Sequence, residues 1–260
     1  MNILVCVKQV PDDYVEIRLD GAGKPATAGV EIVNNAFDTY AVELAARYKE
    51  ANGGSVTVLT LGKDGAQNGL KNLLAVGADK AYLVTQPEGD TDENGIAAYL
   101  TRAIQKCQEL DSTSYDMILC GKESTDEISG QVGAMVAEKL GLPFVSSVIE
   151  VEPASSGLSA KQETESGYIR YEVATPAVFT TAKPGYDPRY PTIKNKMAAR
   201  KAIIPVVSAQ DAGLEAQPAR VTCLGYTEPP RRQAGVKVQE KEAAEAAAKA
   251  VALMAEAKVL

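Results

Sequence analysis

Residues 121–135, GKESTDEISGQVGAM, have the composition of a loop that binds a phosphate group. The segment combines glycines, which permit close approach of the backbone, with the small hydroxyl side chains of Ser124, Thr125 and Ser129. Apolar residues then recur at helical spacing from Val132, so the loop runs into a helix, whose first backbone N–H groups attract anions. The alternative interpretation is a solvent-exposed loop that only caps this helix.

Charged residues in the same loop could also bind a ligand. Lys122 could contact a phosphate, and Asp126 with Glu127 could hold a magnesium ion. Solvated surface positions are the competing interpretation, and two neighbouring acids in a loop are more often just solvated, so we predict no metal site. Neither GxGxxG nor GxxxxGK[ST] occurs, which argues against a standard dinucleotide fingerprint and against a P-loop NTPase.

The composition excludes several other kinds of chemistry. The 260 residues contain no histidine, so Ser–His–Asp and Cys–His pairs, a histidine base and His-ligated zinc are all excluded. A net charge of −7 disfavours nucleic-acid binding. Four cysteines lie far apart without a CxxC motif, which predicts buried thiols in a reducing compartment. We expect a cytoplasmic protein, since no apolar run suits membrane insertion and no targeting segment is evident.

Short apolar runs alternate with amphipathic segments over the first 150 residues. The apolar runs, rich in β-branched residues, predict strands covered on both faces at 2–7, 55–61, 81–84 and 115–120. Between them, residues 37–48 and 96–107 carry apolar side chains at helical spacing, and Asp90 with Glu93 could form a capping box. This alternation predicts a doubly wound α/β domain with a mostly parallel sheet.

Other segments depart from this alternation. Residues 13–19 alternate polar and apolar side chains and predict a small hairpin or edge strand, and residues 158–173 predict a second hairpin turning at Ser166–Gly167. Residues 177–181 resume the buried sheet. In the C-terminal part, residues 220–224 could add a strand, and residues 240–258 predict an Ala-rich helix in an extended arm.

Ligands of an open parallel sheet bind beyond the carboxyl ends of its strands. Those ends fall at residues 6–8, 61–62 and 120–121, with the entry to the first long helix at 34–38. Tyr14 could stack on a ring or simply fill space beneath the hairpin.

The segment 183–201 is rich in Lys and Arg and is usually no more than a solvated, mobile loop. Its functional interpretation is a docking loop, in which Ile193 or Met197 offers an apolar anchor within a basic rim for an acidic partner.

Successive blocks over almost the whole chain resemble the beta subunit of electron transfer flavoproteins. The block with Gln131–Val132–Gly133 and the GADKA block are fairly specific to that family, and PRYPTI and PPRRQAGVKV match parts that other nucleotide-binding α/β domains lack. The blocks, in order, are MNILVCVKQVPDDYVEIRLD, NNAFDTYAVELAARYKE, GLKNLLAVGADKAYLV, YDMILCGKESTDEISGQVGAMVAEKLGLPFVSSV, PRYPTIKNKMAARK and PPRRQAGVKV.

The resemblance implies an electron carrier rather than an enzyme, with no catalytic residue in this chain. A beta subunit of this family forms a heterodimer with an alpha subunit, which holds most of a redox-active FAD. The heterodimer takes electrons from acyl-CoA dehydrogenase-type partners. A Rossmann-like domain, here residues 1–182, holds a structural AMP. A recognition loop would follow at 183–204, and residues 205–260 would form a strand and helix arm on the alpha subunit.

The same resemblance implies site residues. Ile193 matches the aliphatic anchor of the recognition loop, with Met197 beside it, and Tyr14 lies within one position of a tyrosine near the flavin. The implied AMP contacts are Cys6, Asn35, Ala36, Phe37, Asp38, Leu61, Gly121, Lys122, Glu123, Ser124, Thr125, Asp126, Glu127, Ile128, Ser129, Gly130, Gln131 and Val132.

Departures from the family pattern bear on the choice of nucleotide. Electron-bifurcating members typically carry Gly-Asp-Thr-Ala-Gln-Val-Gly-Pro in the phosphate loop and bind a second, NADH-reactive FAD there. This chain has EISGQVGA at 127–134, where Ile128 replaces a carboxylate, so AMP is favoured and the second FAD is the alternative. Ala36 also stands where members often have proline. A free-standing nucleotide-sensing domain is a further alternative.

Overall fold

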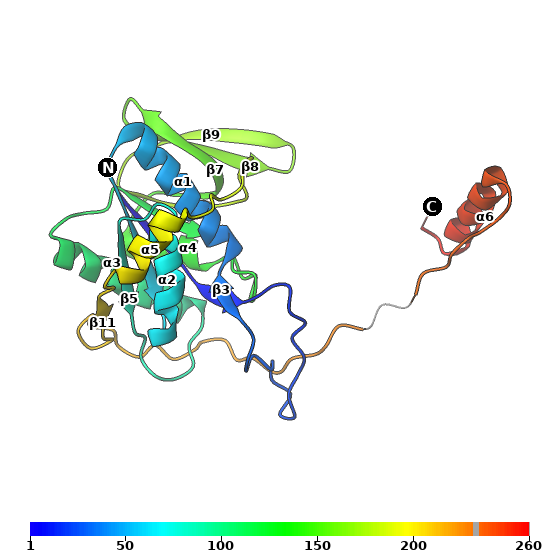
Figure 1. Ribbon diagram of the computed structural model, residues 1–260, viewed down its shortest axis with the longest axis horizontal. Coiled ribbons are helices and arrows are strands. Elements are labelled where there is room, and N and C mark those ends of the chain that lie inside the picture. The colour runs from blue at the N-terminus through cyan, green and yellow to red at the C-terminus, as the bar shows by residue number, and fades with distance from the viewer. Residues whose placement is uncertain (231–233, 260) are drawn as a thin grey trace. The chain divides into compact units, whose positions relative to one another are not determined.

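The computed structural model describes residues 1–230 and 234–259 (Figure 1). The chain divides into a main unit, residues 1–17 with 26–224, and a second unit formed by residues 18–25 and the described residues from 225 onward. The main unit contains a nine-stranded sheet in the order β11-β5-β4-β1-β6-β10-β7-β8-β9. Its strands are β1 Asn2–Cys6, β4 Ser55–Leu61, β5 Lys80–Val84, β6 Met117–Gly121, β7 Phe144–Ala154, β8 Gly157–Thr164, β9 Gly167–Val173, β10 Ala177–Thr181 and β11 Val206–Val207.

The sheet is parallel from β11 to β7 and antiparallel from β7 through β8 to β9. β1 lies in its middle, paired with β4 on one side and β6 on the other. The chain therefore changes direction along the sheet at β1, which is where doubly wound folds open a crevice at the strand ends. The predicted α/β class with a mostly parallel sheet is confirmed.

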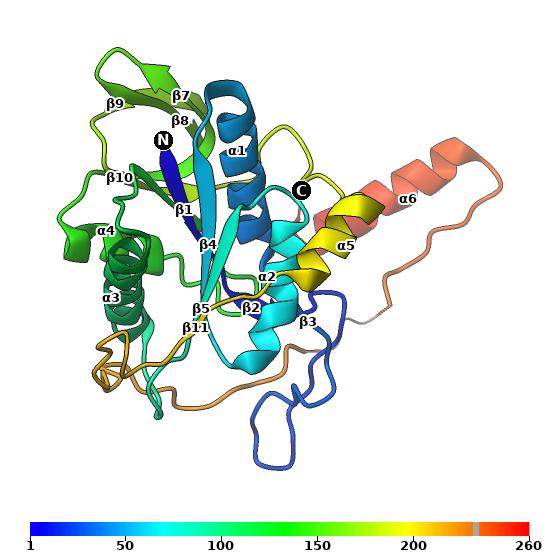
Figure 2. The same ribbon diagram turned by 60° about the vertical axis from the view of Figure 1, so that its left-hand side comes forward.

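Helices cover both faces of the sheet. α1 (Ala36–Asn52) and α2 (Gln67–Leu74) pack on one face, and α3 (Glu93–Asp111) and α4 (Val132–Leu140) pack on the other, as Figure 2 shows. Alternate residues of β1 explain the two cores, because Ile3 and Val5 join the first and Leu4 and Cys6 the second. Strands buried on both faces need the near-continuous apolar runs seen in the sequence.

The hairpins differ in part from the predicted ones. The hairpin within 158–173 is confirmed, since β8 and β9 pair antiparallel around residues 165–166. The N-terminal one is displaced, because its strands are β2 (Gln9–Pro11) and β3 (Ile32–Asn34) rather than 13–19. Residues 220–224 form no strand, and the sheet instead gains β11.

Other local expectations are also corrected. The N-cap of α3 is Asp92, whose side chain accepts a hydrogen bond from the Gly95 N–H, rather than Asp90. Cys6, Cys107 and Cys120 are buried as predicted, but Cys223 is exposed. A short 3-10 turn, η1 (Asp64–Ala66), precedes α2.

The second unit is small. Leu19 forms an isolated antiparallel bridge with Pro25, and the Leu19 N–H donates to Glu228 at 3.1 Å. The Ala-rich helix α6 spans Ala243–Glu256 and has no buried residue in this single chain. Residues 231–233 of the PPRRQAGVKV block lie outside the described residues. Among the helices that the structure describes, none is long and apolar enough to cross a membrane.

Candidate functional site

Asp38 joins the elements at the carboxyl end of the sheet. Its side chain is buried in the first turn of α1. One carboxylate oxygen accepts the Lys8 N–H at 2.7 Å and the other accepts the Gly121 N–H at 2.8 Å. The carboxylate therefore ties the start of α1 to the chain leaving β1 and to the end of β6.

The environment of Asp38 changes its acidity. Burial raises the pKa of this carboxyl to about 7, against the lowering effect of the Lys8 N–H, the Asn35 side chain and the Gly121 N–H. A low-polarity environment disfavours the charged form, while hydrogen bonds donated to the carboxylate favour it. The buried Asp38 carboxyl at this site therefore changes its protonation near neutral pH.

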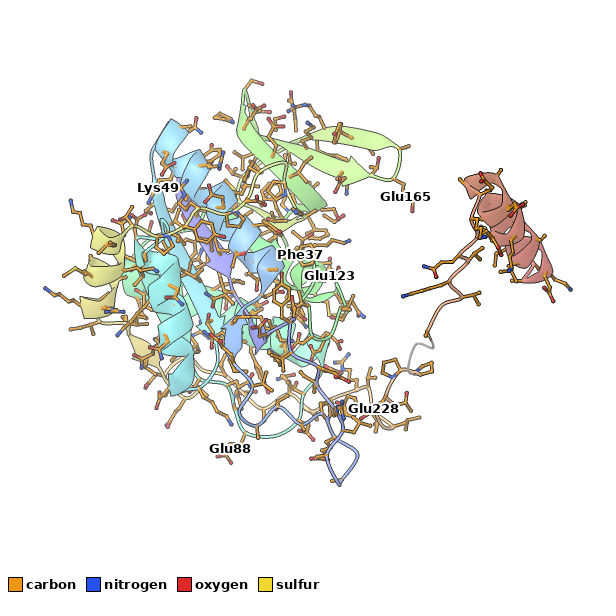
Figure 3. The ribbon with its side chains drawn as sticks, turned by 45° about the vertical axis from the view of Figure 1, so that its right-hand side comes forward. Phe37, Lys49, Glu88, Glu123, Glu165 and Glu228 are labelled. Atoms are coloured by element: carbon orange, nitrogen blue, oxygen red, sulfur yellow. The ribbon has the colours of Figure 1, made fainter. Side chains whose placement is uncertain are left out.

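Asn35 holds the loop 121–131 against the start of α1. Its buried side chain donates to the carbonyl of Glu123 at 2.9 Å and accepts the Thr125 N–H at 3.1 Å. Its own N–H donates to the Lys8 carbonyl at 2.9 Å. Figure 3 labels Phe37, in the first turn of α1, and Glu123, in the loop. These hydrogen bonds give Asn35 a structural role, because they fix the shape of the loop.

Lys8 belongs to the predicted strand end at 6–8, but the sequence does not predict its ion pairs. Its ammonium group lies 2.8 Å from Asp126, 2.9 Å from Glu127 and 3.3 Å from the Ser124 hydroxyl. Burial alone would lower the pKa of Lys8, but the hydrogen bonds to the two carboxylates raise it. The two acids are thus exposed, as the solvated interpretation expects, and they also form ion pairs with Lys8. In the described parts of the chain no group of three or more His, Cys, Asp or Glu side chains could hold a metal ion.

The backbone of the loop takes up unusual conformations before α4 begins. Ile128 and Gly130 have φ angles of +56° and +64°, and a β-branched residue such as Ile128 rarely adopts this region. Helix α4 then begins after Gln131, whose side chain makes no capping hydrogen bond. A Cβ at Gly133 would collide with the Thr180 side chain, so only glycine allows α4 to lie this close to β10.

Besides that of Thr91, before α3, two buried hydroxyl groups at this end of the sheet have no hydrogen-bond partner among the described residues. They belong to Thr125 in the loop and to Thr181, the last residue of β10. Thr181 is paired in register with Gly121, and its carbonyl accepts the Lys122 N–H at 2.9 Å. A buried hydroxyl without a partner costs free energy, so an oxygen-rich ligand that accepted these hydrogen bonds would stabilise the loop.

The remaining predicted contacts lie at the carboxyl ends of β1, β4 and β6 or near them. Cys6 ends β1, and Cys120 lies one residue before the end of the neighbouring strand β6. The hydrogen bond between their thiols, with burial, raises the pKa of Cys6 well above its usual value. The Cys6 thiol is therefore uncharged at neutral pH. Leu61 ends β4, the other neighbour of β1. Tyr14 is 98% exposed, in a turn after β2, and its predicted place near a flavin stays a prediction.

The predicted docking segment contains a helix. This helix, α5 (Ile193–Lys201), lies in the expected mobile loop and is capped by the Thr192 hydroxyl, which accepts the Asn195 N–H at 3.1 Å. Ile193 and Met197 are one helical turn apart and 80% and 58% exposed. The exposed cations of the same helix are Lys194, Lys196, Arg200 and Lys201.

Comparisons with known proteins agree with this architecture. The electron transfer flavoprotein domain matches residues 26–212. Megasphaera elsdenii has an electron transfer flavoprotein subunit beta that is 36% identical over 253 residues, covering 93% of each chain. The subunit of the same name from Thermoanaerobacterium thermosaccharolyticum is 38% identical over 231 residues, or 85% of this chain and 86% of its own. An acryloyl-CoA reductase electron transfer subunit gamma from Anaerotignum propionicum is 31% identical over 252 residues, covering 92% of each chain.

Proposed function

The chain belongs to the electron transfer flavoprotein family, and on that premise we propose that it is the beta subunit of a heterodimeric electron carrier. In this role it shares one FAD with an alpha subunit and binds one AMP of its own. Electrons pass from an acyl-CoA dehydrogenase-type partner to a downstream acceptor through that FAD. The relatives named as electron transfer subunits support the electron transfer part of the proposal.

The buried Thr125 hydroxyl, which has no hydrogen-bond partner among the described residues, is the observation that supports a nucleotide in this chain. The phosphate of AMP would lie against residues 121–132, where it would accept hydrogen bonds from Thr125 and from the first N–H groups of α4. Lys8, Asn35 and Asp38 would keep the loop in the shape that this binding requires. AMP would complete the structure of the subunit and would carry no electrons.

The docking part of the proposal concerns α5. An exposed aliphatic pair, Ile193 and Met197, lies among four cations on a chain whose net charge is −7. Complementary charges accelerate encounter, and one buried anchor with a polar rim gives a short-lived complex. Such a surface suits a carrier that must leave its donor quickly after electron transfer.

A count of bound nucleotides tests the proposal directly. The heterodimer is purified after co-expression with its alpha subunit, its ligands are released by heat, and AMP and FAD are quantified by chromatography. One FAD and one AMP per heterodimer is the expected result. Two FAD and no AMP would overturn the AMP assignment and would favour the bifurcating alternative, which reduction of the second flavin by NADH would then identify.

A further inference from the structure

A buried carboxylate in the middle of α1 is bonded to two arginines. The Glu43 side chain is only 2% exposed, and one of its oxygens accepts both the backbone N–H of Arg189, at 3.1 Å, and its Nε, at 2.8 Å. The other oxygen accepts Arg47 Nε at 2.6 Å and Arg189 Nη2 at 3.2 Å. Burial acts to raise the pKa of Glu43, but the hydrogen bonds from Arg189 and Arg47 hold it below its usual value.

Arg189 makes a second set of contacts two turns further along α1. Its Nη2 donates to Glu50 at 3.0 Å, and its Nη1 also pairs with that carboxylate. Nearby, the Arg47 guanidinium lies 3.9 Å from the ring centroid of Tyr186. The segment before α5 is thus attached to α1 at Tyr186 and at Arg189, by groups with strict directional requirements.

Apart from Arg189, helix α5 is held by its packing on α2 and by the strand β11 that follows it. Ala199 is its only buried residue, and the Arg200 carbonyl accepts a hydrogen bond of 3.3 Å from Lys71 on α2. A helix of nine residues is not stable alone, so its position depends on what holds its ends. The Lys71 contact holds the C-terminal end, and Arg189 lies four positions before Ile193, at the N-terminal end.

We propose that Arg189, bonded to the buried Glu43, is the positioning residue that fixes α5 on the main unit and so determines how Ile193 and Met197 are presented. The second part of this proposal, that Arg189 orients a docking surface, rests on the proposed function. Buried ion pairs add little net stability compared with apolar packing, whereas the bidentate geometry of Arg with carboxylates defines direction well. Such a pair is therefore suited to orienting α5, whose side chains are nearly all exposed.

The test measures amide hydrogen exchange in the heterodimer with Arg189→Gln and Arg189→Lys in this chain. We expect the amides of α5, residues 193–201, to exchange at least tenfold faster in Arg189→Gln, with a smaller effect in Arg189→Lys. Exchange in α4, at residues 132–140, and the bound nucleotide should stay unchanged. The matched control is Arg102→Gln, which removes an exposed pair with Glu109 on α3. Unchanged exchange in α5 would overturn the proposal.

A kinetic measurement separates this inference from the docking proposal. With an acyl-CoA dehydrogenase that reduces the wild-type heterodimer, Arg189→Gln should raise the KM for the heterodimer severalfold and leave kcat within about twofold. A general loss of folding would instead lower the amount of active protein and change the nucleotide content. Faster exchange in α5 with an unchanged KM would support the positioning role of Arg189 and would count against the docking role of α5.

Discussion

The Asp38 carboxylate and the Gly121 N–H form a hydrogen bond of 2.8 Å between positions 83 residues apart. The bond joins the first turn of α1 to the last residue of β6, and the same carboxylate accepts the Lys8 N–H. Three segments that are distant in sequence therefore meet at one buried acid. The loop 121–131 is thus connected to the chain leaving β1 and to α1 through this one carboxylate.

Gly121→Ala should disrupt that junction. A Cβ at this position would collide with the Asp38 carboxylate and lie 2.8 Å from the Cβ of Phe37. Overpacking of this kind costs about 1–3 kcal/mol, and the displaced Asp38 would release the loop as well. We expect a lower unfolding free energy in urea and less nucleotide per heterodimer. Gly65→Ala, where a Cβ would meet open space, is the control and should change the unfolding free energy by less than about 0.5 kcal/mol.

Asp38→Asn should change how stability depends on pH. The folded pKa, about 7, lies above the ordinary value of 3.8, so the folded state binds this proton more tightly than the unfolded state does. The wild type therefore loses stability relative to the variant as pH rises from about 4 to about 7. Its unfolding free energy falls by at most ~1.4 kcal/mol per pH unit relative to that of the variant. Above this range the difference between the two unfolding free energies is constant. Urea unfolding of both proteins across this range measures the difference. Parallel curves would show that Asp38 does not titrate there.

Lys8→Gln should weaken nucleotide binding with little effect on stability. The Lys8 side chain is 40% exposed, so its pairs with Asp126 and Glu127 contribute less than about 1 kcal/mol to folding. Without them the loop should sample more conformations, and the affinity for AMP should fall about three- to tenfold, since binding must then order the loop. Calorimetric titration of the AMP-depleted heterodimer measures this. Lys80→Gln, which removes the ion pair with Asp111, should bind AMP like the wild type.

The sequence predicts the sheet and the strand ends well because both depend on local pattern. Buried parallel strands require continuous apolar runs, and the carboxyl ends of β1, β4 and β6 then follow from the run boundaries. The loop 121–131 is recognisable since glycine and hydroxyl residues before a helix are themselves a local signal.

Contacts between distant charged residues could not be predicted in this way. Lys8 pairs with an acid 118 positions away, and Arg189 with Glu43 across 146 positions, so neither pairing leaves a pattern within any short window. The sequence does not predict helix α5 either, because the helix packs on α2, a segment more than 100 positions away. Glu43 on the apolar face of α1 was the one available signal, since a buried acid requires a cationic partner.

Ile193→Ala is the sharpest test of the docking surface. The side chain is 80% exposed in this chain, so its truncation should leave folding and bound nucleotide unchanged. If it enters a pocket on the dehydrogenase, loss of the anchor should cost about 1–3 kcal/mol of binding, seen as a severalfold or larger fall in electron transfer from the dehydrogenase. Stopped-flow reduction of the flavin at limiting dehydrogenase measures this rate.

The control for Ile193→Ala is Leu110→Ala, which removes a half-exposed aliphatic side chain near the end of α3. Its transfer rate should match that of the wild type, which would show that the loss at Ile193 is specific to α5. Met197→Ala should have a smaller effect in the same direction, because that side chain lies one turn further along the helix and is less exposed. Wild-type kinetics in the Ile193 variant would remove the docking role of α5, and the acidic partner would then have to bind another face.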